Sequence, residues 1–217
     1  KQGRFFEMSK TYHSAKTLAE EKEVITVGMY GSCDFYDLKG ITENVFESLG
    51  ITNIEYEADR DNNIFHTGRC ADIKLNGKII GTFGQINYSV TSEYAAAEDT
   101  YVLVMDISSL VENACFTNTF VQLPKYPSSV RDLSIVVNRD VLSADIIKSV
   151  KNAVREILED VTLFDIYTGG QIEDGSKSLS YSFTFRSKDR TLEEDEINKS
   201  MEKIINILEK DYKAKLR

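Results

Sequence analysis

Residues that build redox, metal and nucleophilic sites are scarce in this sequence. Its three cysteines are odd in number and far apart, with no CxxC pair, so neither a disulfide framework nor a zinc site is expected. Its two histidines lack the neighbours that a Ser/His/Asp triad, a Cys/His dyad or an HExxH helix needs. The composition therefore predicts no catalytic residue and no metal site in this chain, and the free thiols favour a reducing cytoplasm.

Long apolar runs and prolines are also scarce. No run of about 18 apolar residues is present, so neither a membrane span nor a membrane partner is expected. The chain begins without Met or a signal peptide and inside a predicted strand, which predicts an excised fragment of a longer protein. The only two prolines, Pro124 and Pro127, stiffen the segment 122–127, because proline fixes φ and donates no amide hydrogen. This segment predicts a joint between two domains, 1–121 and 122–217.

The formal net charge of −9 falls almost entirely before this joint. Residues 1–121 carry 10 Lys and Arg against 18 Asp and Glu, a net charge of −8. Residues 122–217 carry 16 against 17, a net charge of −1. A domain that binds nucleic acid through bulk charge is strongly basic. Any RNA contact in the second half must therefore use a local patch.

The first domain has the sequence pattern of an α+β fold with a mainly antiparallel sheet. Apolar residues at helical spacing predict one helix between an N-capping Asp34 and a left-handed Gly50. Asn76-Gly77 predicts a type I′ hairpin turn, which needs positive φ at both central positions. The expected strands are 5–12, 24–30, 54–58, 71–75, 78–83 and 101–107.

Four segments of this domain occur in the order of a known family. They are GRFF at 3–6, DFYDLKG at 34–40, HTGRCA at 66–71 and NGKIIGTFG at 76–84. In this order they resemble the catalytic-like module of the bacterial phenylalanyl-tRNA synthetase β subunit. The resemblance implies a class II synthetase-type antiparallel sheet that has lost its catalytic residues and packs against the catalytic α subunit. Consistently, the chain has no FRxE segment and no glycine-rich arginine motif of an ATP-binding class II site.

The second domain has the order βαββαβ, which is that of the ferredoxin-like fold. The expected strands are 133–137, 161–168 and 179–186, with a short closing strand at 214–217. One expected helix starts at a capping Ser143 and carries an apolar stripe to Leu158. The other opens with a capping box at 191–194.

In this fold the helices cover one face of the sheet and leave the other open. Period-2 counting predicts a helix-side face of Leu133, Ile135, Val137, Phe164, Ile166, Leu179, Tyr181, Phe183 and Phe185. The open face is predicted to show Asp132, Ser134, Asp165, Tyr167, Ser180, Ser182, Thr184 and Arg186. One aromatic, one arginine and several hydroxyls suit single-stranded RNA, because Tyr167 can stack a base while Arg186 and the hydroxyls reach base edges or phosphates. The alternative is a solvated antiparallel face with no ligand.

Further segments connect this face to the same family. They are residues 127–137, LFDIY at 163–167, KSL at 177–179, FRS at 185–187 and RTL at 190–192. These resemble the ferredoxin-fold anticodon-binding domain that ends the same β subunits. The resemblance implies that Tyr167 stacks an anticodon base and that Arg131, Asp132 and Arg186 are RNA-binding. The predicted open face adds the hydroxyls of Ser180, Ser182 and Thr184 as RNA-binding groups. Arg131 and Asp132 can equally form a structural ion pair that pins the strand.

The resemblance implies a subunit of phenylalanine–tRNA ligase. The whole enzyme would be a cytoplasmic (αβ)2 assembly that joins phenylalanine to tRNA(Phe) using ATP and Mg2+, while this chain holds no cofactor, packs against the α subunit and anchors the tRNA. Two other readings stay open. One is a regulatory amino-acid-binding module, because ferredoxin-like domains serve many functions. The other is a purely structural domain at a subunit interface.

Overall fold

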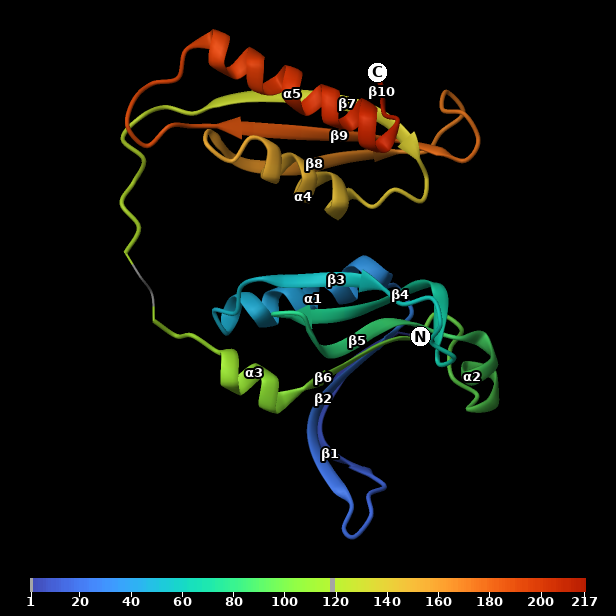
Figure 1. Cartoon of the computed structure of the whole chain (residues 1–217). Helices are drawn as coiled ribbons and strands as arrows, with labels where there is room; N and C mark the ends of the chain where they lie inside the picture. The colour runs from blue at the N-terminus through green and yellow to red at the C-terminus, as the bar shows by residue number, and fades with distance from the viewer. Residues whose placement is uncertain (1, 118–119) are drawn as a thin grey trace. The chain divides into compact units, whose positions relative to one another are not determined.

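The computed structural model describes residues 2–117 and 120–217, which divide into two compact units, Lys1–Thr119 and Phe120–Arg217. Each unit has its own antiparallel sheet, as Figure 1 shows. Each also has its own buried core. The predicted α+β fold class is therefore confirmed. No helix in the described residues is long and apolar enough to cross a membrane.

The first unit is a six-stranded sheet in the order β1-β2-β6-β5-β4-β3, in which every neighbouring pair is antiparallel. Its strands are β1 (Gly3–His13), β2 (Glu20–Tyr30), β3 (Ile54–Ala58), β4 (Phe65–Leu75), β5 (Lys78–Ile86) and β6 (Tyr101–Asp106). Its helices are α1 (Phe35–Ser48), α2 (Tyr88–Glu93) and α3 (Ile107–Asn113). The core lies between α1 and the sheet, where Leu38 and Phe46 of the helix are buried with Phe83 of β5.

The predicted boundaries of α1 are confirmed by its caps. The Asp34 side chain accepts hydrogen bonds from the amides of Tyr36 at 2.7 Å and Asp37 at 2.9 Å, and the Asp37 carboxylate accepts one from the Asp34 amide at 2.9 Å. This reciprocal pair satisfies amide groups that the first turn of a helix leaves without partners. After the helix ends, Gly50 takes the left-handed conformation at a φ of +64°.

The turn between β4 and β5 is also as predicted, since Asn76 and Gly77 have φ of 51° and 81°. The helices α2 and α3 were not predicted. Sequence reasoning extended β6 to residue 107, but the Asp106 side chain accepts a hydrogen bond from the Ser109 amide at 2.6 Å and so begins α3.

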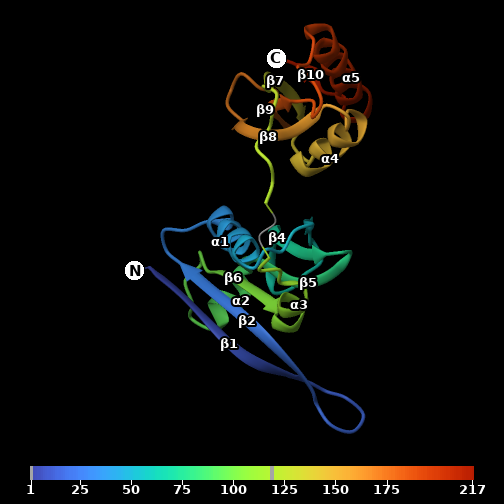
Figure 2. The ribbon, with the colours of Figure 1, turned by 90° about the vertical axis from the view of Figure 1, so that its left-hand side faces the viewer.

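The strands β1 and β2 run beyond the rest of the sheet as a two-stranded arm, which Figure 2 shows in profile. β2 pairs with β6 only from Val24 to Met29, so the earlier residues of β2 pair with β1 alone. β1 is an edge strand of the sheet, and most of its side chains are exposed.

The second unit confirms the ferredoxin-like order. Its strands are β7 (Ser129–Asn138), β8 (Leu158–Tyr167), β9 (Ser176–Phe185) and β10 (Lys215–Leu216), arranged antiparallel in the order β10-β7-β9-β8. The helices α4 (Ser143–Ala153) and α5 (Glu194–Tyr212) lie on one face of this sheet, as Figures 1 and 2 show. Together they bury an apolar core that includes Tyr181, Phe183 and Phe185 of the central strand β9.

The predicted caps of the two helices were wrong in detail. Ser143 is the first helical residue rather than the N-cap, which is Leu142, and its Oγ accepts a hydrogen bond from the Tyr181 hydroxyl at 3.0 Å. The helix also ends at Ala153, so the predicted stripe residues 157 and 158 lie outside it and still pack against the core.

The capping box of α5 uses Glu193 and Glu196 instead of residues 191–194. The Glu196 carboxylate accepts hydrogen bonds from the Glu193 amide at 3.0 Å and from Arg190 Nη1 at 2.6 Å. The hydrogen bond from Arg190, with the Glu193 amide adding to it, lowers the pKa of Glu196 to about 2.

Two predicted core residues are solvent-exposed. Phe164 is 56% and Ile166 52% exposed. They lie on the edge strand β8, where the pairing with β9 shifts between Leu163 and Asp165. This bulge interrupts the strict alternation of faces at Phe164. Ile166 still lies opposite the core residue Leu179, on the predicted helix side, but it stays exposed on the edge strand.

Candidate nucleic-acid interface

The open face of the second sheet is defined by the pairing of its strands. Residues directly opposite each other on antiparallel strands share a face. Tyr167 lies opposite Ser178, Asp165 and Ser134 both lie opposite Ser180, and Asp132 lies opposite Ser182. The neighbouring positions of β9 point into the helix-side core. The predicted open face therefore carries Asp132, Ser134, Asp165, Tyr167, Ser180, Ser182 and Thr184, and the structure adds Ser178.

Tyr167 is the aromatic residue at the end of β8, and 37% of its surface is exposed. The guanidinium carbon of Arg217 lies 5.2 Å from the centre of its ring. This distance is within the range of a cation–π interaction. Tyr167 and Arg217 thus present two planar groups at one corner of the open face, a combination suited to stacking a nucleic-acid base.

Arg217 was not predicted as a site residue. Its amide donates a hydrogen bond to the Ser134 carbonyl at 3.0 Å, which continues the pairing of β10 with β7. Its guanidinium nitrogens lie 3.5 Å from Ser178 Oγ and 3.4 Å from Gln171 Oε1. A sequence signal was available in the expected closing strand, where the apolar Ala214 and Leu216 alternate with Lys215 and Arg217, so that the two basic residues share the face away from the core.

The hydroxyl groups of this face are not equally available. Ser180 is buried, and its Oγ shares a hydrogen bond of 2.8 Å with Ser134 Oγ. The two hydroxyl groups are thus hydrogen-bonded to each other within the sheet. Ser182 and Thr184 are half-buried on the same strand. Of the predicted hydroxyls, those of Ser182 and Thr184 are the ones partly open to solvent.

The structure engages the Arg186 guanidinium in contacts within the protein. Its Nε lies 3.0 Å and 2.9 Å from the two carboxylate oxygens of Glu159, and its Nη1 donates to the Tyr126 carbonyl at 2.6 Å. Tyr126 belongs to the proline segment. Arg186 therefore fastens that segment and the start of β8 to the end of β9.

Arg131 and Asp132 lie on opposite sides of the sheet. Arg131 is opposite the core residue Phe183, which places it on the helix side, and its Nη2 lies 3.2 Å from Glu194 Oε1 at the start of α5. The ion pair considered between Arg131 and Asp132 is therefore wrong, since the carboxylate partner of Arg131 is Glu194. Asp132 is exposed on the open face.

Comparison with known proteins gives two family matches that follow one another along the chain. Residues 1–107 match the phenylalanyl tRNA synthetase beta chain CLM domain, and residues 124–217 match the ferredoxin-fold anticodon binding domain. The chain belongs to the phenylalanyl-tRNA synthetase β-chain family. The resemblance seen in the sequence motifs is thereby confirmed over both halves.

Curated relatives carry the name of the same family. The phenylalanine–tRNA ligase beta subunit of Clostridium acetobutylicum is 38% identical over 99% of this chain and 27% of its own length. That of Bacillus subtilis is 34% identical over 85% of this chain and 23% of its own length. The chain thus spans about a quarter of the length of these β subunits. A solved pyrrolysyl-tRNA synthetase from Desulfitobacterium hafniense has a TM-score of 0.41 and 14% identity over 50% of this chain and 40% of that chain.

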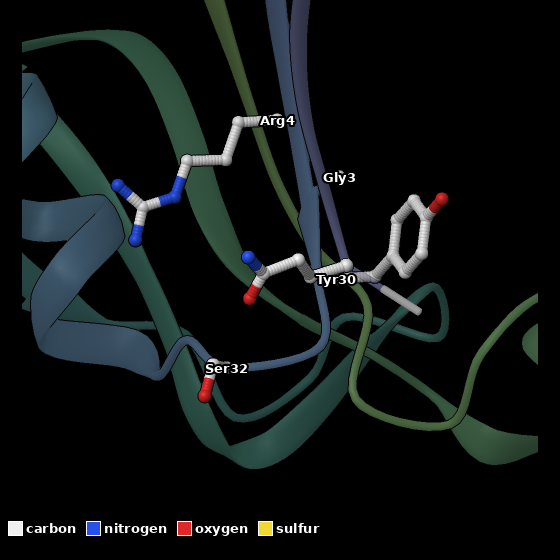
Figure 3. Close-up of a pocket in the computed structure, with 5 residues that line it drawn as sticks. Gly3, Arg4, Tyr30 and Ser32 are labelled. Carbon is white, nitrogen blue, oxygen red and sulfur yellow. The ribbon is translucent and has the colours of Figure 1, made fainter.

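In the half that matches the β-chain CLM domain, a hollow of about 270 Å³ lies where β1 begins and β2 ends. It is lined by Gln2, Gly3, Arg4, Tyr30 and Ser32. Figure 3 shows that Arg4 and Tyr30 point in different directions. Within residues 2–117 and 120–217, no group of three or more His, Cys, Asp or Glu side chains is placed to hold a metal ion. The site that the geometry defines best is therefore the open face of the second unit.

Proposed function

We propose that this chain is the part of a phenylalanine–tRNA ligase β subunit that binds the anticodon region of tRNA(Phe) and packs against the catalytic α subunit. In this proposal residues 122–217 form the anticodon-binding domain and residues 1–121 a non-catalytic module. The observation that supports it most is the Tyr167–Arg217 pair on the open face of a unit that matches an anticodon-binding family. The whole enzyme attaches phenylalanine to tRNA in the cytoplasm as an (αβ)2 assembly.

Anticodon bases suit this face because they lie in a single-stranded loop. Unpaired bases can be splayed out, stacked on an aromatic ring or a guanidinium plane, and hydrogen-bonded at their edges. Tyr167 and Arg217 supply the two planes, and Asp132, Ser182 and Thr184 supply acceptors and donors for base edges. Bases take the specific contacts, while phosphate contacts position the RNA.

The remaining predicted residues have a supporting part in this proposal. Arg186, Arg131 and Ser180 each have a protein partner, Glu159, Glu194 and Ser134 respectively. They keep the strands, the proline segment and α5 in place beneath the RNA surface. In this respect the proposal differs from the sequence prediction, which made all three RNA ligands.

The β1–β2 arm supplies the surface proposed for the α subunit. Phe6 and Met8 lie opposite Val27 and Ile25, which are partly buried against the core of the first unit. Phe6 is 70% exposed and Met8 61% exposed. The arm therefore continues the apolar core face outward into solvent, on an edge strand whose outer backbone groups are open to pairing. A protein partner that covers this face would bury both.

ATP and Mg2+, which the whole enzyme would use, have no proposed site in this chain. The described residues offer no cluster of metal-binding side chains. In this proposal both bind parts of the assembly outside this chain, and no step of the proposed function of this chain passes through them.

The anticodon proposal is tested by an NMR titration of the 217-residue chain with the anticodon stem-loop of tRNA(Phe) at low salt, beside a stem-loop with an altered anticodon. Signals of Tyr167, Arg217 and Ser182 should move only with the correct loop. Tyr167→Ala should weaken binding by about 1–3 kcal/mol, the contribution of one stacked base. If neither RNA moves these signals where electrostatic attraction is strongest, the open face is not an RNA site and a structural role takes its place. Movement of these signals by free phenylalanine would instead favour a regulatory module.

The partner proposal is tested by co-expressing the chain with the α subunit. The double variant Phe6→Ser, Met8→Ser should no longer co-purify with the α subunit. Ile64→Ser provides the control, because Ile64 is 55% exposed and directly precedes β4, which β2, β6 and β5 separate from β1 in the sheet. Co-purification of the double variant at the wild-type level would show that the α subunit binds elsewhere.

A further inference from the structure

Gly169 lies two residues after Tyr167, in the loop that joins β8 to β9. A side chain at this position would collide with the tyrosine. A Cβ atom built on Gly169 would lie 2.1 Å from the Tyr167 hydroxyl oxygen and 2.3 Å from its Cζ, where real Cβ atoms essentially never come within 3.0 Å. The neighbouring Gly170 differs, since no atom of residues 2–117 or 120–217 lies within 4 Å of a Cβ added there.

The loop that brings Gly169 to the tyrosine is tied in place. The Gly169 carbonyl accepts a hydrogen bond from the Ile172 amide at 2.9 Å. Two residues after Gly169, the side-chain oxygen of Gln171 accepts a hydrogen bond from the Arg217 guanidinium at 3.4 Å. Arg217 also lies over the Tyr167 ring. The hydroxyl end of the ring therefore meets the loop backbone, while the ring itself meets the guanidinium.

Backbone strain does not account for glycine at this position. The φ of Gly169 lies outside the left-handed range, unlike that of Gly175 in the same loop, so alanine can adopt the backbone conformation. The atoms that an added Cβ would meet belong to the far end of a side chain that can rotate. An alanine at 169 would therefore move the Tyr167 ring and leave the fold in place.

We propose that Gly169 is a positioning residue of the RNA site. Its missing side chain lets the Tyr167 ring lie against the loop, beneath Arg217, where a base can stack on it. Gly169 itself does not touch the base and acts through Tyr167. This role depends on the proposed anticodon-binding function, and it adds a requirement that Tyr167 alone does not satisfy.

The test compares Gly169→Ala with Gly170→Ala in the 217-residue chain, using the anticodon stem-loop of tRNA(Phe) as the probe. Gly169→Ala should weaken binding on the order of tenfold, because the stacking platform is displaced. Gly170→Ala should bind like the wild type. Neither substitution removes a charge, so the dependence of affinity on salt should stay the same, whereas Arg217→Ala should reduce that dependence if the guanidinium reaches a phosphate.

A second readout reports the ring without RNA. In NMR spectra of chain labelled at tyrosine, the Tyr167 ring signals are assigned by their absence in Tyr167→Phe. Gly169→Ala should shift these signals and leave those of the other ten tyrosines in place. Gly170→Ala should shift none.

The possible results distinguish the positioning role of Gly169 from the proposed anticodon binding. If the wild type binds and Gly169→Ala binds equally well, or if the Tyr167 signals do not move, the positioning role is overturned while anticodon binding stands. A loss of dispersed signals throughout the second unit would also overturn it, because Gly169 would then be needed for folding. If the wild-type chain binds no RNA, the proposed function fails first, and the positioning role falls with it.

Discussion

The substitution Arg186→Lys tests whether Arg186 stabilises the fold or binds RNA directly, as the sequence predicts. The guanidinium donates in two directions: its Nε–H is shared between the two Glu159 carboxylate oxygens, and its Nη1 donates to the Tyr126 carbonyl. A lysine keeps the positive charge but has a single nitrogen, which cannot reach both partners in this fork geometry. The substitution therefore loses contacts without changing the net charge of the face.

The expected loss in free energy of unfolding follows from how far the Arg186 and Glu159 side chains are buried. The Arg186 side chain is 23% exposed and that of Glu159 40% exposed, so their ion pair is partly screened by water and contributes about 1 kcal/mol. The hydrogen bond to the Tyr126 carbonyl contributes about 1 kcal/mol more. Arg186→Lys retains one of these and should lower the free energy of unfolding of the second unit by about 1 kcal/mol. Arg186→Ala, which retains neither, should lower it by about 2 kcal/mol.

Urea unfolding of the 217-residue chain, followed by NMR signals of the second unit, measures this loss. A stem-loop titration of Arg186→Lys should give the affinity of the wild type, because the charge is kept and the open face is unaltered. The contradicting result is a large loss of RNA affinity with unchanged stability. That outcome would show that the guanidinium leaves Glu159 for the RNA, as the sequence alone predicted.

Three further predictions concern packing, an unpaired hydroxyl and a helix cap. Gly50→Ala puts a Cβ 2.0 Å from a backbone carbonyl oxygen at a φ of +64°, so it should lower the free energy of unfolding in urea by about 2–3 kcal/mol. Gly77→Ala is also at positive φ, but no atom of the described residues lies within 4 Å of its Cβ, so it should cost about 1 kcal/mol. Equal losses for the two variants would refute the clash. Tyr56→Phe removes a buried hydroxyl without a hydrogen-bond partner in the described part of the chain and should leave stability unchanged or raise it by about 1 kcal/mol, while Tyr181→Phe breaks a hydrogen bond and should lower it by about 1 kcal/mol. Because the pKa of Glu196 is lowered from 4.5 to about 2, its carboxylate stabilises the fold above pH 4.5 and this stabilisation is lost as pH falls towards 2. Glu196→Gln should flatten acid unfolding in that interval, as followed by circular dichroism, and an unchanged pH profile would contradict this.

The elements that were predicted well depend on neighbours in the chain. The cap at Asp34 and the turn at Asn76-Gly77 are made within three or four residues, so their signals are complete in the local sequence. The helices α2 and α3 have only 6 and 7 residues and offer too few positions for helical periodicity to appear.

The family and the ferredoxin-like order were available from the sequence by itself, because motif order, strand alternation and helical spacing are properties of the linear chain. Which groups remain free on the open face was decided only by tertiary structure. Ser180 meets Ser134 across 46 residues, and Arg186 meets Glu159 across 27 residues. Arg217 reaches Tyr167 only because β10 pairs with β7 and carries the guanidinium over the sheet. Such contacts depend on strand register and on bulges, and no local pattern encodes the partner that a distant strand brings.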